Sequence, residues 1–106
     1  MEQLHLITKV LRKMITGICK VSIHIPGSNS LKDKRQVIKG IKDKIRHNFN
    51  VSIAEVDDEE LWQKSILGIA CVSNQQNHIA EVFSQIINTI KNNAEIYILD
   101  SQIEFL

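Results

Sequence analysis

The chain has 106 residues, of which 43% are hydrophobic, 24% charged and 5% aromatic, with four glycines and one proline. This composition is typical of a single folded domain and excludes a linker-rich or disordered chain, and a domain of this length needs no disulfide or metal to stabilise it. No apolar run approaches the ~18 residues that cross a bilayer, and the N-terminus lacks the pattern of a signal peptide. We therefore expect a cytoplasmic protein without membrane contact.

The net charge of +1 conceals two unequal halves. Residues 1–53 carry a net charge of +8 and residues 54–106 a net charge of −7. Seven of the 13 lysines and arginines lie between Lys32 and Arg46. Such clustering on one segment directs attention to a polyanionic partner.

In chain order, residues 1–13 are predicted to be an N-terminal extension that frays or forms an accessory turn outside the core, and residues 14–106 to be one domain. Residues 15–25 alternate between apolar and polar side chains, which predicts a half-buried strand. Pro26 and Gly27 end it. Ser30 followed by Asp33 resembles a capping box, so we expect a helix from Ser30 to about His47.

The second half continues with a strand over residues 51–56, an acidic loop over residues 57–60 and a strand over residues 65–73 that is apolar on both faces. An amphipathic helix is predicted over residues 79–90. A last strand is expected over residues 96–105, with Tyr97, Leu99, Ile103 and Phe105 on one face.

The order β-α-β-β-α-β predicts an α+β fold, the ferredoxin-like sandwich, in which a four-stranded antiparallel sheet carries two helices on one face and strands one and three in the middle. Cys19 and Cys71, 52 positions apart and outside any Cys-x-x-Cys pattern, are interpreted as reduced thiols buried in central strands, although a metal or redox pair is the alternative.

Known catalytic and metal-binding motifs are missing from the sequence. The four histidines are isolated, and the acidic loop lacks the spaced ligands and the glycine of a calcium loop. We expect no catalytic residues, no metal and no cofactor.

The predicted first helix carries a row of cations. At 100° per residue, five basic side chains fall within a sector of about 80° and extend for about 21 Å, with one cation about every 5 Å. They form a basic stripe: Lys32, Arg35, Lys39, Lys42 and Arg46. Phosphates of a nucleic-acid strand have a similar spacing, so the stripe could contact an RNA backbone without reading bases. The alternative is an amphipathic helix whose solvated face is rich in lysine.

The loop before this helix is a candidate anion site. The free N–H groups and the dipole of a helix N-terminus favour an anion, and we assign Ser28, Asn29, Ser30 and Lys34 to this site. A serine-capped turn that needs no ligand is the alternative.

The face of the sheet away from the helices is predicted to expose an apolar patch of Ile18, Ile66, Ala70 and Val72, which self-association would cover. No aromatic side chain lies on the central strands, so stacking of bases on the sheet is not expected. Trp62 packs at the rim of the patch or plugs the end of the hairpin.

Several short segments together resemble the small bacterial YlxP-like family, a domain of unknown function. They are Ile25-Pro26-Gly27-Ser28, Ser30-Leu31-Lys32, Lys34-Arg35, Phe49-Asn50-Val51-Ser52, Ala54-Glu55-Val56, Leu61-Trp62-Gln63-Lys64 and Leu67-Gly68. The resemblance covers Met14 to Leu106 and implies a ferredoxin-like fold. Genes of this family often lie beside those of translation initiation and ribosome-assembly factors, which implies a connection with RNA or the ribosome. This chain differs in its residues before Met14 and in its more acidic loop.

Two functions remain open. The first is a non-catalytic accessory protein that binds RNA or a ribosomal subunit through the basic stripe. The second is a homodimeric protein-interaction module that uses the open sheet face, with the basic helix merely solvated.

Overall fold

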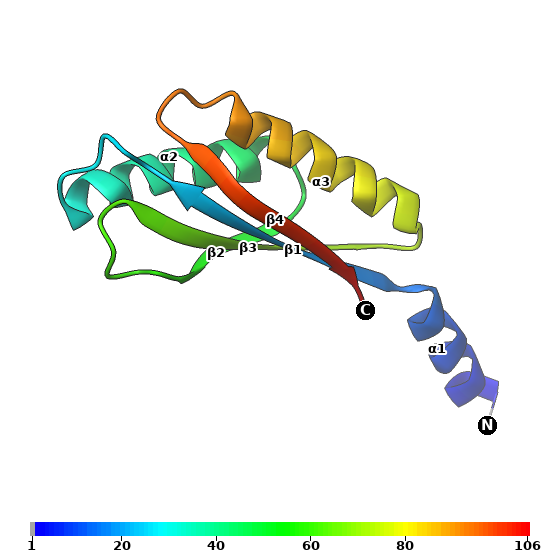
Figure 1. Ribbon diagram of the computed structural model, residues 1–106. Coiled ribbons are helices and arrows are strands. Elements are labelled where there is room, and N and C mark those ends of the chain that lie inside the picture. The colour runs from blue at the N-terminus through cyan, green and yellow to red at the C-terminus, as the bar shows by residue number, and fades with distance from the viewer. Residues whose placement is uncertain (1) are drawn as a thin grey trace.

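The computed structural model of the protein describes residues 2–106. Its elements are α1 (Glu2–Lys13), β1 (Ile15–His24), α2 (Leu31–Asn48), β2 (Ser52–Asp57), β3 (Lys64–Ser73), α3 (Gln76–Lys91) and β4 (Tyr97–Phe105). The strands form one antiparallel sheet in the order β2-β3-β1-β4. Helices α2 and α3 cover one face of this sheet (Figure 1). The predicted α+β class, the antiparallel sheet and the central position of β1 and β3 are confirmed.

The cap predicted for α2 is present. The Asp33 backbone N–H donates to Ser30 Oγ at 3.0 Å, and Ser30 has the extended backbone of an N-cap residue. The helix therefore begins where its sequence offers a side-chain acceptor for an N–H group that has no partner within the helix.

The core lies between the sheet and the two helices. Alternate residues of β1, among them Val21 and Ile23, are fully buried, as are Ile41 and Ile45 of α2 and Phe83 of α3. Each such side chain stabilises the fold by about 1.5–3 kcal/mol. A Cβ atom at Gly17 would collide with Ile79 and Phe83, so a glycine in β1 lets α3 approach the sheet closely.

Strand β4 departs from the predicted alternation. Asp100 pairs with Ser22 and Ile98 pairs with Ile23, so Leu99 is an extra residue in a β-bulge. The bulge reverses which residues face the helices, and Ile98 packs against the core while Tyr97 and Leu99 are exposed. The prediction that Tyr97 and Leu99 share a face with Ile103 and Phe105 is therefore wrong.

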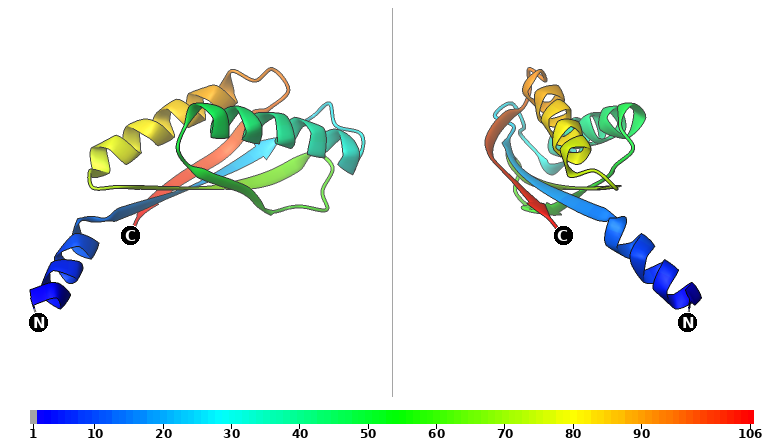
Figure 2. Two further views of the ribbon diagram at one scale, coloured as in Figure 1. Left: turned by 180° about the vertical axis from the view of Figure 1, so that it is seen from behind. Right: turned by 90° about the vertical axis from the view of Figure 1, so that its right-hand side faces the viewer.

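The extension was predicted to fray or to form an accessory turn outside the core. Residues 2–13 instead form a regular helix, and Met1 lies outside the described residues. In Figure 2, α1 projects beyond the end of the sheet and away from α2 and α3. The radius of gyration is 16.3 Å, compared with about 13 Å for a compact domain of 100 residues. The projecting helix accounts for this elongation.

Candidate nucleic-acid interface

The basic stripe predicted from the sequence, called the α2 stripe from here on, lies on the outward surface of α2. Lys32, Arg35, Lys39 and Arg46 are exposed, and Lys42 is half-buried. The buried side of the same helix carries Ile38, Ile41 and Ile45, so the apolar face and the stripe are separated as helical periodicity requires. The fold thus presents all five cations from one rigid element.

An acidic residue that the sequence reasoning overlooked interrupts the stripe. Asp43 Oδ2 accepts a hydrogen bond from Lys39 Nζ at 2.9 Å, four residues earlier on the helix. This hydrogen bond and the charges of Lys39, Arg46 and Lys42 lower the pKa of Asp43, against a smaller opposing contribution from desolvation. The spacing i, i+4 from a lysine is the sequence signal that identifies such a pair.

Arg46, at the C-terminal end of the stripe, is partly engaged. Its Nη2 donates to the backbone oxygen of Ile53 on β2 at 2.9 Å, which fixes the side chain along the edge of the sheet. The guanidinium group has five N–H donors, so others remain for a further partner.

The loop before α2 is closed by hydrogen bonds within the chain. Ser28 is buried and its Oγ donates to Ser30 O at 3.0 Å. The Asn29 backbone N–H donates to Asp33 Oδ2 at 3.0 Å. The carboxylate of Asp33 and the hydroxyl of Ser30 each accept from a backbone N–H group here, as the capped-turn alternative describes.

Lys34 does not belong to an anion site. Its side chain is fully buried, and Nζ donates to the backbone oxygens of Asp58, Glu59 and Lys64 at 2.7, 3.0 and 3.2 Å. Glu55 Oε2 lies 3.1 Å away and also accepts from Ser65 Oγ. The ammonium group therefore holds the β2–β3 loop against α2, and its donors are not available to a ligand.

Trp62 lies in the loop that Lys34 holds. With 57% of its surface exposed it does not plug the hairpin, and it lies with Ser28 and Asn29 around a shallow hollow near the start of α2. The Gln63 amide nitrogen donates to the backbone oxygens of Pro26 and Ser28 at 3.2 and 3.0 Å. These bonds and those of Lys34 join both sides of the loop to neighbouring segments, so the indole is presented from a constrained backbone.

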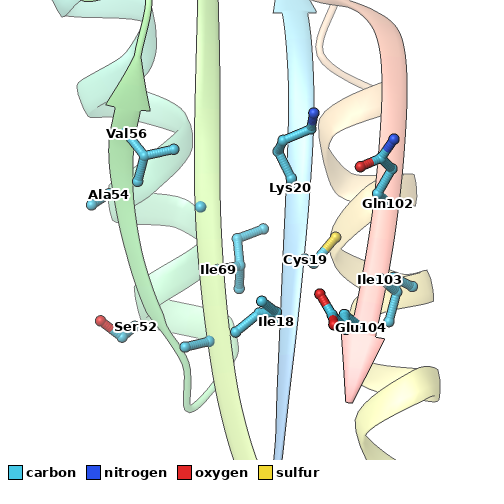
Figure 3. Close-up of a pocket in the computed structure, with 12 residues that line it drawn as sticks. Ile18, Cys19, Lys20, Ser52, Ala54, Val56, Ile69, Gln102, Ile103 and Glu104 are labelled. Atoms are coloured by element: carbon cyan, nitrogen blue, oxygen red, sulfur yellow. The ribbon is translucent and has the colours of Figure 1, made fainter. Parts of the chain in front are cut away.

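The face of the sheet away from α2 and α3 carries a hollow of about 810 Å³ (Figure 3). Its floor is formed by small side chains on the inner strands and β2, including Ala54, Gly68 and Ala70, with Val56 and Ile18 on its sides. A Cβ atom at Gly68 would lie 2.8 Å from Val56 Cγ1, so the absence of a side chain allows Val56 to lie over β3. Of the apolar patch expected on this face, Ile18 and Ala70 line the hollow, whereas Val72 is exposed outside its lining and Ile66 is half-buried.

The two cysteines are free and lie on the helix-covered side of the sheet. Burial raises the pKa of Cys19 to about 11, and that of Cys71 is also raised by burial. Both thiols stay protonated at neutral pH, which suppresses nucleophilic reactivity.

Within residues 2–106, no three side chains of the ligating types gather in a way that could hold a metal ion. No helix in this range is long and apolar enough to cross a membrane.

Comparison with known proteins places most of this chain. Residues 16–103 match the model of the family described as "Protein of unknown function (DUF503)". The uncharacterized protein YlxP of Bacillus subtilis (strain 168) is 32% identical over 80 residues, which cover 76% of this chain and 87% of that protein. The de novo designed protein Foldit4 is 10% identical, with a TM-score of 0.52 over 88% of this chain and 96% of that one, a likeness of fold alone. The chain belongs to the DUF503 family and is YlxP-like.

Proposed function

We propose that this protein is a non-catalytic accessory protein of the cytoplasm that binds single-stranded RNA, including RNA exposed on a ribosomal subunit, through the α2 stripe. The observation that carries the proposal is the row of five cations on one outward helix surface. We also infer that the β-α-β-β-α-β core is ferredoxin-like, which the strand order and the shared face of α2 and α3 support.

The chemistry of the stripe suits a phosphate backbone. Cations about 5 Å apart along a helix can each approach one phosphate without any requirement on the base. Within residues 2–106, Lys32 and Arg35 make no side-chain hydrogen bond or ion pair. On binding, Lys39 would exchange its contact with Asp43 for a phosphate, and Arg46 would add a phosphate to its contact with Ile53. Three to five phosphate contacts are therefore available.

Trp62 adds a surface for a base near the start of the stripe. Stacking on an exposed aromatic ring contributes about 1–3 kcal/mol per base and tolerates any sequence. The indole lies beside Asn29, just before α2, so a strand that follows the stripe toward its N-terminal end reaches the ring. The acidic residues 57–60 flank it and weaken RNA binding at this end.

The test is a titration of labelled single-stranded RNA at several salt concentrations, together with co-sedimentation with ribosomal subunits at two salt concentrations. If three to five cations contact phosphates, the logarithm of the association constant (log K) falls linearly with the logarithm of the salt concentration, at a slope of about −2 to −3.5. A tryptophan fluorescence change on binding reports stacking on Trp62. Failure to bind either RNA or subunits at low salt would refute the proposal.

A homodimeric interaction module is the second candidate function. The hollow on the open sheet face favours it, because an apolar surface of this kind is seldom left in water. Light scattering at micromolar concentration distinguishes this candidate from a monomeric RNA-binding protein, and the two functions do not exclude each other.

A further inference from the structure

Helix α1 exposes an apolar face that nothing in the described part of the chain covers. Its large apolar side chains are 56–69% exposed, and helical periodicity places them within a sector of about 160°. They are Leu4, Leu6, Ile7, Val10 and Leu11. The charged residues of α1 after Glu2 are all basic: Lys9, Arg12 and Lys13.

A helix of this length requires a surface to pack against. An isolated helix of about 12 residues is only marginally stable in water. The entropy lost in forming its first turn is offset only by the hydrogen bonds of a longer helix or by packing against another surface. The amphipathic pattern of α1 therefore indicates a docking helix whose apolar face contacts another surface.

The sheet of the same copy cannot supply that surface. Met14 is the only residue between Lys13 at the end of α1 and Ile15 at the start of β1, whereas a reversal of the chain takes a turn of about four residues. Met14 N donates to Leu11 O, so this residue is itself part of the helix end. Figure 2 shows α1 directed away from the sheet, and the molecule extends 59 Å along its long axis.

The open sheet face has the shape and the charge to receive α1. The hollow is floored by Ala54, Gly68 and Ala70, small residues over which the backbone of a helix can approach closely. On β4, Glu104 and Asp100 pair with open-face residues of β1 and provide carboxylates along one rim. Lys20, beside Gln102 in Figure 3, and Lys64, which pairs with His24, are cations on this face. A basic helix with an apolar face matches this hollow and its acidic rim.

We propose that α1 of each protomer docks in the open sheet face of a second copy of the chain, so that two copies exchange their N-terminal helices. The exchange is reciprocal and closes with two-fold symmetry. The one-residue connection between α1 and β1 favours it, because α1 cannot fold back onto the sheet of its own copy. Four side chains of each α1 would bury on the order of 100 Å² apiece, and the sheet beneath them would lose a similar area. Summed over the two docking sites, the interface totals about 1,600 Å². A stable dimer needs about 1,200–2,000 Å².

The test measures the mass of the full chain by light scattering across micromolar concentrations. The wild-type chain is expected to be a dimer. Ile7→Glu, on the apolar face of α1, and Ala54→Glu, on the exposed edge strand of the hollow, are each expected to shift the dissociation constant upward by at least tenfold and give monomers. Ala80→Glu, the same substitution on the exposed surface of α3, is the matched control and is expected to remain dimeric. Circular dichroism checks that every variant is folded.

Mixing the two monomeric variants separates helix exchange from other dimers. The Ile7→Glu chain retains an intact sheet face and the Ala54→Glu chain an intact α1, so the mixture restores one of the two docking sites and forms a weaker heterodimer. Absence of a heterodimer at concentrations where each variant alone is monomeric would overturn the proposal, as would a dimer that only Ile7→Glu disrupts, which indicates pairing of α1 with α1.

Two further results would also overturn the proposal. One is a wild-type chain that remains monomeric at every concentration. The other is a monomer that co-sediments with anionic phospholipid vesicles in a way that Ile7→Glu abolishes, since this would assign the apolar face of α1 to a lipid surface. Neither result bears on RNA binding by the α2 stripe, which is measured separately.

Discussion

Two lysines of α2 that lie two residues apart have opposite environments. Lys34 is fully buried, and its ammonium group donates to three backbone oxygens and forms an ion pair with Glu55. Lys32 is exposed and belongs to the α2 stripe. The difference follows from position on the helix, since Lys34 precedes Ile38, Ile41 and Ile45 by four, seven and eleven residues and so lies in the middle of their apolar face. One cation stabilises the fold and the other is free to contact a ligand.

The largest effect is expected at Lys34. Lys34→Met keeps most of the side-chain volume but leaves three backbone oxygens without their donor and removes the cation beside Glu55, which keeps only the Ser65 hydroxyl. We therefore expect a loss of about 3 kcal/mol in the free energy of unfolding. Thermal denaturation measures this as a fall of roughly 10–20 °C in melting temperature. Lys32→Met is the matched control and is expected to change the free energy by at most ~0.5 kcal/mol. Equal melting temperatures for the two variants would contradict the contrast between them.

Local patterns predicted most of the fold. Ser30 and Asp33 identified the start of α2, and the alternation in β1 identified the buried face, because hydrogen bonding of a cap and burial of a strand face depend on neighbours in the sequence. The bulge at Leu99 was missed because it depends on the pairing of β4 with β1, a long-range contact. The helix at residues 2–13 was not predicted, because so few residues form only a marginal helix in water without a surface to pack against.

The candidate site was predicted less well. The five cations lie on one surface as the spacing indicated, but Lys34 was assigned by its closeness in sequence to the anion loop, although its spacing from Ile38 already marked it as buried. Its partners in residues 58–64 lie 24–30 residues further along the chain, so only the folded structure reveals them. Asp43 was visible in the sequence as a partner of Lys39 and was overlooked.

The next largest effect concerns the exposed cations alone. Lys39→Glu combined with Lys42→Glu places two negative charges in the middle of the stripe, and we expect RNA affinity at low salt to fall by well over tenfold. Lys44→Glu combined with Lys91→Glu changes the net charge equally but lies off the stripe, and it is the matched control. If both pairs weaken binding to the same extent, overall charge and not the stripe governs the interaction.

The smallest effect, and the most specific, is expected at Asp43. Asp43→Asn removes the only carboxylate that pairs with a stripe cation in residues 2–106, and it releases Lys39 Nζ from its 2.9 Å contact. RNA affinity should rise severalfold, and the slope of log K against log salt should become steeper by up to about 0.7, the contribution of one additional phosphate contact on single strands. The free energy of unfolding should change by less than ~1 kcal/mol, because the ion pair is exposed.

The acidic loop supplies the comparison for Asp43. Asp57→Asn combined with Asp58→Asn removes two charges near Trp62 while keeping the side-chain oxygen that accepts from the Asp58 backbone N–H, and asparagine tolerates the positive φ of residue 58. We expect this pair to change affinity little or to improve it slightly, with an unchanged slope, since no stripe cation is released. An Asp43→Asn variant that behaves like the loop variant would show that Lys39 makes no phosphate contact, and the stripe would then be limited to the cations on either side of it.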